Sequence, residues 1–325
     1  MALENPRLIH SADLTLLSCP PSALKELAFF LWLFFWRWEA FWGGSFFFVE
    51  IALREMPPLA VTLHRVGWAA AFLSIVIWQK GLAIPRGLKN WTCYFVMGAL
   101  NNVVPFSLIF WSQVTLDSGT AAILNSTTAV FGAVIAAIFL ADERLTVGKS
   151  LGAVFGILGV VIMVGMDSIL TLELKSLAQL AIIGAAISYS LASVWAKKFL
   201  SAHPPMMNAF CMLMSSTLIM VPVSILGEGL PQFDLSISVW GALLSLAILS
   251  TGVAYILYFE ILKRAGAANL MLVTLIIPPV AIVLGSMFLG ERLGVQAFAG
   301  FLLIAIGLAI IDGRVFALAF NQRVR

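Results

Sequence analysis

The sequence predicts an all-α integral membrane protein with ten transmembrane helices, built as two five-helix inverted repeats with both termini in the cytoplasm. Three observations lead to this prediction: an apolar composition, ten long apolar runs, and a self-similarity between the two halves. Of the 325 residues, 61% are hydrophobic and 11% are charged, whereas roughly 25% of a soluble domain is charged. An aqueous core cannot hide so much apolar surface, so lipid is expected to be the main solvent.

Ten apolar runs, each near the roughly 20 residues that a spanning helix needs, are separated by short polar or Pro/Gly segments. They cover residues 28–53, 59–79, 91–113, 119–140, 147–166, 176–197, 206–226, 238–262, 267–289 and 293–312. Strands are disfavoured, because a transmembrane barrel shows alternating segments of about ten residues. Residues 1–27 and 313–325 are predicted to be cytoplasmic tails.

The distribution of Lys and Arg predicts the orientation of these helices, since basic residues gather in cytoplasmic connections. With the N-terminus inside, the inner segments hold fourteen of the nineteen basic residues. The outer connections hold three, namely Arg54, Lys175 and Arg292. We therefore expect both termini to lie inside.

The second half of the chain repeats the first. A shift of 148 residues places Asp142-Glu143-Arg144-Leu145 on Gly290-Glu291-Arg292-Leu293, and a shift of 147 places Pro57-Pro58 on Pro204-Pro205. Because each repeat has an odd number of helices, the second copy enters the membrane from the opposite side. The repeats are predicted to cover residues 28–166 and 167–312. Such inverted repeats are typical of transporters whose substrate site lies near the midplane of the membrane.

These motifs resemble the EamA-domain family of the drug/metabolite transporter (DMT) superfamily. In the first half the resemblance lies in Trp42-Gly43-Gly44-Ser45 and in Asn101-Asn102 followed by Pro105-Phe106. In the second half it lies in Pro278-Pro279 and Gly290-Glu291-Arg292-Leu293. The resemblance implies that each half is one EamA repeat in a ten-helix, multi-pass protein of the bacterial inner membrane. It also implies efflux of amino acids or similar small metabolites.

Polar and aromatic residues inside the spans predict a substrate cavity, because polar groups are costly in lipid and normally face the interior of the bundle. The candidate substrate-binding residues are Trp42, Ser45, Arg65, Asn101, Asn102, Asn125, Thr128, Tyr189, Tyr255, Tyr258 and Thr274. Rings, amides and hydroxyls suit a neutral or zwitterionic, amphipathic solute. Hydrogen bonding between helices is the competing interpretation of each polar residue alone, and for Arg65 a structural role competes evenly with solute contact.

Prolines and ionisable residues inside the spans suggest further roles. Pro105 and the pair Pro278-Pro279 are expected to break helices and to contribute to gating. Glu39 and His64 are candidates for proton coupling. Glu39 gives the alternative hypothesis, a proton-coupled exporter of lipophilic cationic drugs.

Glycines at four-residue spacing in the 147–166 span predict close packing of helices. They are Gly148, Gly152 and Gly156. A structural role is favoured, although the 147–166 and 293–312 helices would also suit a homodimer face.

The sequence argues against several other classes of function. It contains no nucleotide-binding Gly-rich loop followed by Lys-Ser/Thr, and no HExxH or Ser/His constellation, so neither ATP use nor catalysis is expected. Cys19, Cys93 and Cys211 are isolated, which gives no metal site. The net charge of +3 without a basic stripe indicates no nucleic-acid partner. We therefore predict a secondary transporter without cofactors, whose partners are a small-molecule substrate and the lipid bilayer.

Overall fold

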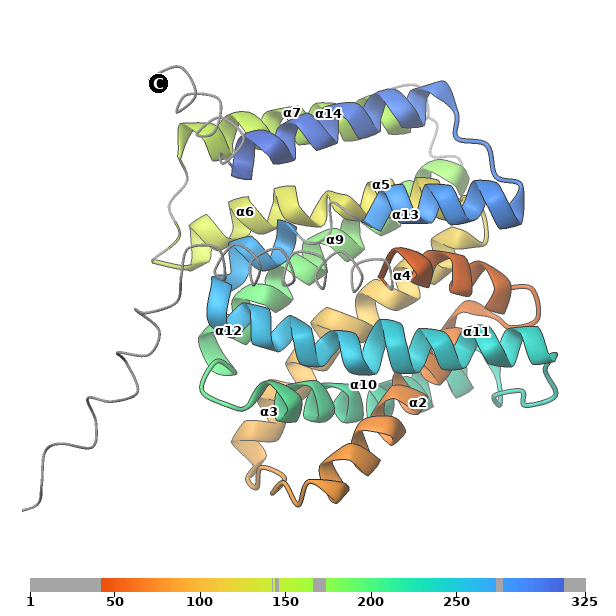
Figure 1. Ribbon diagram of the computed structural model, residues 1–325, viewed down its shortest axis with the longest axis vertical. Helices are drawn as coiled ribbons and strands as arrows, with labels where there is room; N and C mark the ends of the chain where they lie inside the picture. The colour runs from red at the N-terminus through yellow and green to blue at the C-terminus, as the bar shows by residue number, and fades with distance from the viewer. Residues whose placement is uncertain (1–41, 142, 144–145, 166–173, 273–276, 313–325) are drawn as a thin grey trace, which may run out of the picture. The chain divides into compact units, whose positions relative to one another are not determined.

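The computed structural model describes residues 42–141, 143, 146–165, 174–272 and 277–312, and all regular structure in these ranges is helical (Figure 1). Seven helices are long and apolar enough to cross a membrane: Pro58–Gln79, Leu88–Gln113, Ser118–Phe139, Val147–Val164, Leu174–Phe199, Pro205–Glu228 and Ile237–Lys263. Two shorter apolar helices, Ile277–Leu289 and Val295–Ile311, and a helix at 42–52 fall on further predicted runs. The prediction of an all-helical membrane protein is confirmed, and the count of ten spans stays a prediction.

Several of these helices divide into shorter elements, because π-helical turns interrupt them. The α-helices are α2 (Pro58–Gln79), α3 (Leu88–Gly98), α4 (Val104–Gln113), α5 (Ser118–Ser126), α6 (Thr128–Phe139), α7 (Val147–Val164), α9 (Leu174–Phe199), α10 (Pro205–Glu228), α11 (Ile237–Ala247), α12 (Ala254–Leu272), α13 (Ile277–Leu284) and α14 (Val295–Asp312). The π-helical turns are η1 (Ala99–Val103), η2 (Ile248–Val253) and η4 (Gly285–Leu289).

The end of α12 differs from the prediction. The sequence suggests a break between the 238–262 and 267–289 spans, but α12 continues to Leu272. The segment after Lys263 and Arg264 is rich in alanine, the best helix former, and one glycine there costs only about 1 kcal/mol. The two basic residues therefore lie within a helix and not in a connection.

The proline pair of the second half lies in the described part of α13. This part covers Ile277–Leu284 and contains Pro278 and Pro279. The preceding residues 273–276, on which the predicted kink depends, lie outside the described residues.

Helices α7 and α14 pack against each other through glycine. A Cβ atom on Gly152 would collide with the carbonyl of Gly307, and one on Gly159 would collide with the carbonyl of Gly300. Partner numbers that fall as the glycine numbers rise mean that the two helices run antiparallel. The close helix contact predicted from the glycine spacing is therefore confirmed, whereas a homodimer stays a prediction.

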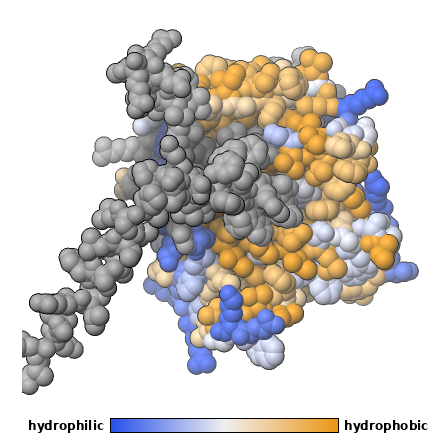
Figure 2. All heavy atoms as spheres, in the orientation of Figure 1, coloured by the Kyte–Doolittle hydropathy of each residue, from blue (hydrophilic) through white to orange (hydrophobic). Residues whose placement is uncertain are grey.

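Helices from the two halves of the sequence interlock. Helix α2 packs against α10 and α11, α9 packs against α4 and α6, and α5 packs against α13. Figure 2 shows hydrophobic residues covering the sides of the helices, with hydrophilic residues gathered toward their ends. Large apolar side chains such as Leu151 and Val154 on α7 and Phe298 on α14 are exposed. This surface suits a hydrocarbon solvent.

Candidate functional site

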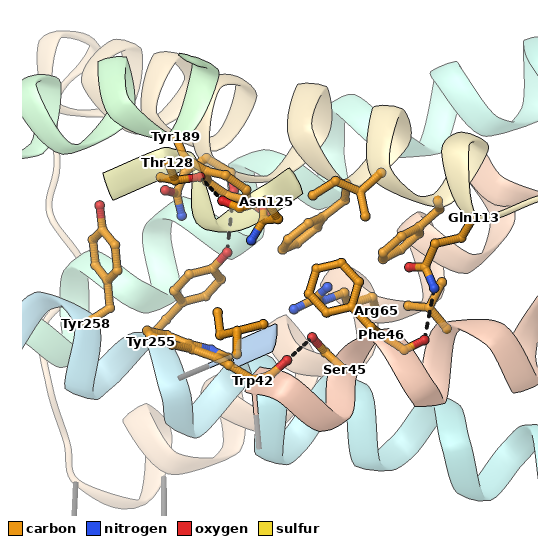
Figure 3. A pocket seen from close by; sticks show the side chains of 16 residues that line it. Trp42, Ser45, Phe46, Arg65, Gln113, Asn125, Thr128, Tyr189, Tyr255 and Tyr258 are labelled. Atoms are coloured by element: carbon orange, nitrogen blue, oxygen red, sulfur yellow. Dashed lines mark hydrogen bonds between the residues drawn. The ribbon is translucent and has the colours of Figure 1, made fainter. Parts of the chain in front are cut away.

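A cavity among the helices gathers most of the residues that the sequence singles out (Figure 3). The space, including its open part, is about 730 Å³. Nine of the eleven predicted substrate-binding residues line it: Trp42, Ser45, Arg65, Asn101, Asn125, Thr128, Tyr189, Tyr255 and Tyr258. These side chains come from the helix at 42–52 and from α2, η1, α5, α6, α9 and α12. Both halves of the sequence therefore contribute to one wall.

Arg65 is the only charged side chain among the described residues that line the cavity. Its Nε donates to Thr251 Oγ1 at 2.8 Å, and its Nη2 donates to the carbonyl of Ser250 at 3.4 Å. The guanidinium carbon lies 3.8 Å from the centre of the Phe106 ring and 5.7 Å from that of Phe110. A cation at this distance from an aromatic face is attracted by the ring quadrupole. Neutral groups alone therefore hold a buried cation in place.

The π-helical turn η2 supplies the anchor for both Arg65 and Trp42. The indole Nε1 of Trp42 donates to the carbonyl of Ser250 at 3.1 Å, so this one oxygen accepts from two different helices. Ser45 in turn donates its hydroxyl to the carbonyl of Trp42 at 2.5 Å. A π-helical turn shifts the register of backbone hydrogen bonds and commonly marks functional sites in helices.

The π-helical turn η1 lies just before Pro105, which has no N–H to donate. Side-chain hydroxyls bind the carbonyls of the preceding turn: Ser188 donates to Leu100 O at 2.7 Å, and Tyr255 Oη lies 3.4 Å from Asn101 O. The proline therefore donates no hydrogen bond to the carbonyls of the preceding turn, and side chains of α9 and α12 donate to them instead.

Asn102 does not line the cavity. Its amide nitrogen donates to Ser216 Oγ on α10 at 2.7 Å, and its Oδ1 accepts from the Tyr255 hydroxyl at 2.6 Å. Asn102 is fully buried in this network. Hydrogen bonding between helices therefore explains Asn102, and it does so by orienting the cavity residue Tyr255.

Several polar atoms of the cavity wall are buried and have no hydrogen-bond partner among the described residues. They are Asn101 Oδ1, Gln113 Oε1, Asn125 Oδ1 and the hydroxyl of Tyr258. The amide nitrogen of Gln113 is used, since it donates to the carbonyl of Phe46 at 3.0 Å. Buried polar atoms are nearly always paired, so these atoms are suited to accept hydrogen bonds from a bound solute.

Three further candidates are not among the described residues that line the cavity. Thr274 and Glu39 fall outside the described residues. His64 is buried but does not line the cavity; its Nδ1 accepts from Trp68 Nε1 at 3.1 Å, and its ring contacts that of Trp240.

Sequence reasoning missed the apolar part of the wall. The additional lining residues are Phe46, Val49, Phe106, Ile109, Phe110, Gln113 and Ile277. The six apolar members are indistinguishable in sequence from side chains that face lipid or the core. Gln113 carried a usable signal, because it is an amide at the end of the predicted 91–113 span.

One end of the helices carries glutamates that bind the backbone at helix starts. Glu228 at the end of α10 accepts from the N–H groups of Leu59 and Ala60 at 3.0 and 2.9 Å, at the start of α2. Glu55 accepts from Ser236 N at 2.8 Å, just before α11. Carboxylates are favoured at these positions because helix N-termini carry partial positive charge.

Glu291 caps α5 in the same way, in place of the N-cap residue Asp117, whose side chain makes no capping hydrogen bond. Its carboxylate accepts from Ser118 N at 2.9 Å, Ser118 Oγ at 2.8 Å and Gly119 N at 3.2 Å. A Cβ atom on Gly285 would collide with this carboxylate and with Ser118 Oγ, so a larger residue there would displace the cap. We call the turns 53–57, 114–117, 229–236 and 290–294 the glutamate-capped end. Each cap joins a residue of one half of the sequence to a helix of the other.

Comparisons with known proteins agree with this architecture. A family model described as EamA-like transporter family matches residues 30–165 and 176–312. The uncharacterized transporter YoaV of Bacillus subtilis is 25% identical over 270 residues, covering 82% of this chain and 91% of its own. Protein PecM of Dickeya dadantii is 26% identical over 291 residues, covering 89% and 92%. A crystal structure with 19% identity superposes with a TM-score of 0.63 over 86% of this chain and 96% of that chain, which shows a likeness of fold.

Proposed function

This chain belongs to the EamA-like transporter family, and we propose that it exports small amino-acid-like solutes, neutral or zwitterionic, across the bacterial inner membrane by alternating access. Its family and its apolar helices make it a multi-pass membrane transporter of the DMT superfamily. The observation that carries the finer proposal is the cavity, whose wall combines aromatic rings, amides and one guanidinium drawn from both halves. We assign this wall a binding role and no catalytic one.

The chemistry of the cavity favours such a solute over a lipophilic cation. Its only charged described side chain, Arg65, is itself a cation and would repel a positively charged drug. The alternative hypothesis depends on Glu39, which lies outside the described residues.

Two features support inverted repeats and hence alternating access. The turns η1 and η2 begin 149 residues apart, at Ala99 and Ile248, close to the shift that relates the repeats. The shift of 148 residues relates Gly152 to Gly300 and Gly159 to Gly307. In the structure Gly152 meets Gly307 and Gly159 meets Gly300, so the contacts between α7 and α14 are crossed. Crossed contacts between antiparallel helices are the pattern that a two-fold axis in the membrane plane produces.

An efflux assay tests the proposed function. Cells loaded with a radiolabelled amino acid should lose it faster when they contain the wild-type chain, and Trp42→Ala, Asn101→Ala or Tyr189→Ala should slow this loss at equal protein levels in the membrane. Leu151→Ala, on the exposed face of α7, is the matched control and should export normally. Normal export by all three cavity variants would contradict the proposal.

A tag-accessibility experiment tests the proposed orientation. A tag inserted after Gly229, between α10 and α11, should be reached from the periplasm, and a tag at the C-terminus only from the cytoplasm. Labelling of both tags from the same side would refute the inverted arrangement.

A further inference from the structure

We propose that the cavity holds its solute by a carboxylate bound to Arg65, with the solute's ammonium group directed to the amide oxygens of Asn101 and Asn125. This inference rests on the proposed export function and narrows it to zwitterionic amino acids with apolar side chains. It follows from three observations on the wall: an incompletely used guanidinium, unpartnered amide oxygens and an aromatic patch.

The guanidinium has donors to spare. Of the five N–H groups of an arginine, Arg65 uses two, toward Thr251 and the carbonyl of Ser250. The remaining three, including both on Nη1, have no acceptor among the described residues. Because Nε and Nη2 are fixed by the π-helical turn η2, the free donors are held in a defined direction. Figure 3 shows the guanidinium nitrogens amid the lining side chains, with Asn125 on one side and Ser45 on the other.

The charge of Arg65 also has no counter-ion in the described part of the chain. Among the described residues no carboxylate pairs with it, and the groups it contacts are a hydroxyl, a carbonyl and the ring of Phe106. A buried cation is costly unless an anion or sufficient hydrogen bonds compensate it. A solute carboxylate would supply both a counter-ion and acceptors for the free N–H groups. The planar fork of arginine matches the two oxygens of a carboxylate.

The amide oxygens supply the opposite half of the recognition. Asn101 Oδ1 and Asn125 Oδ1 lack partners, and their side chains are only 1% and 6% exposed. An ammonium group has three N–H donors and no acceptor, which suits carbonyl-type oxygens. Because these acceptors are neutral, they orient the amine but attract it less than Arg65 attracts a carboxylate.

The aromatic patch would take the side chain of the solute. Phe46, Phe106 and Phe110 line the cavity together with Val49 and Ile109. Such a surface gains free energy by removing apolar area from water. These five side chains themselves offer no polar contact for a charged or hydroxylated side chain, which favours solutes such as phenylalanine.

A ligand panel on the purified wild-type protein in lipid nanodiscs tests the assignment. The probes are phenylalanine, 3-phenylpropionate, which lacks the amine, and phenethylamine, which lacks the carboxylate. Phenylalanine should bind best, 3-phenylpropionate about 5- to 10-fold more weakly and phenethylamine about 10- to 100-fold more weakly, since charge-assisted hydrogen bonds are the strong ones. Binding of phenethylamine as tight as that of 3-phenylpropionate overturns the inference, and so does a failure of both carboxylates to bind.

Variants assign the two ends of the solute. Arg65→Gln should weaken phenylalanine and 3-phenylpropionate by about 10- to 100-fold and should not weaken phenethylamine, because the substitution removes a charge that repels its ammonium group. Arg65→Lys should recover part of the carboxylate binding, since it keeps the charge but loses the fork. Asn125→Ala should weaken phenylalanine and leave 3-phenylpropionate unchanged. If the Arg65→Gln protein binds all three probes with wild-type affinity, the inference is refuted.

The two proposals fail in different ways. If amino acids are exported but the amine and the acid bind equally, export stands and the role of Arg65 is wrong. If carboxylates bind through Arg65 but no amino acid is exported, the proposed function is wrong and the site assignment stands.

Discussion

Replacing Glu291 with glutamine tests whether the glutamate-capped end opens during transport. In the structure this carboxylate joins the turn before α14 to the first turn of α5. A transporter that works by alternating access must separate such contacts in one of its states. Glu291→Gln keeps the shape of the side chain but removes its charge and one of its two acceptor oxygens.

The expected magnitude follows from the contacts. Oε2 accepts from Ser118 Oγ at 2.8 Å and from Gly119 N at 3.2 Å, whereas Oε1 accepts from Ser118 N. A negative charge at a helix N-terminus stabilises by about 0.3–1 kcal/mol, and each net hydrogen bond adds about 0.5–1.5 kcal/mol. Water compensates part of the lost interaction in the variant. We therefore expect the closed state to lose about 1–2 kcal/mol of stability, which shifts the equilibrium toward the open state by about 5- to 30-fold.

Double electron–electron resonance between spin labels at Thr115 and Val295 measures this shift, since both side chains are exposed and flank the contact. The longer-distance population should rise by the same factor in Glu291→Gln. Glu55→Gln is the comparison variant and should shift the population less, because its exposed carboxylate accepts one backbone hydrogen bond at 2.8 Å. An unchanged distribution in Glu291→Gln, or an equal change in Glu55→Gln, refutes the reasoning.

Asp117 adds a pH dependence to the same contact. Partial burial and, next, the neighbouring Glu291 raise the pKa of Asp117 above its ordinary value of 3.8. An acid whose pKa is raised in the closed state stabilises that state less as pH rises through the raised pKa. The closed population should therefore fall as pH rises from the ordinary value toward the raised pKa of Asp117, and Asp117→Asn should reduce this fall. An identical pH response in the variant contradicts the assignment.

Two further predictions concern packing and buried hydrogen bonds, and thermal unfolding in detergent measures both. Gly152→Ala should destabilise the protein by about 1–3 kcal/mol, because the new methyl group meets a backbone carbonyl of α14. Gly241→Ala should not destabilise it, because there is open space around Gly241. Equal effects of the two substitutions would disprove the glycine contact. Tyr255→Phe should cost about 1 kcal/mol by stranding a buried amide oxygen, whereas Tyr258→Phe removes a hydroxyl without a described partner and should cost less. A reversed order would show that the Tyr255 hydrogen bond contributes nothing.

The sequence predicts the helices well because lipid imposes a simple rule on composition. An apolar run of about 20 residues has few alternatives to a spanning helix. The rule fails at the end of α12, since Lys263 and Arg264 end the apolar run without ending the helix. Charge reports where the membrane ends, and only backbone propensity reports where the helix ends.

The polar part of the site was predictable for a related reason. An amide such as Asn125, or a tyrosine such as Tyr189, needs a cause when it lies inside a span, and a cavity is one such cause. Asn102 has the same sequence signal as Asn101 but binds α10, because neighbouring helical residues face different directions and only packing decides which faces the cavity. Phe106 gave no signal, since a ring against Arg65 looks the same in sequence as a ring in lipid.

The carbonyl oxygen of Ser250 gives the wall of the cavity a mechanical linkage. It accepts from Trp42 and from Arg65 at once, and these residues belong to helices that are separate in the chain. A ligand that pulls the guanidinium away removes one of these two hydrogen bonds and leaves the one from the indole. The positions of the Trp42 ring and the Arg65 guanidinium are therefore coupled. Replacing both residues should change the affinity for the ligand by an amount that differs from the sum of the two single effects.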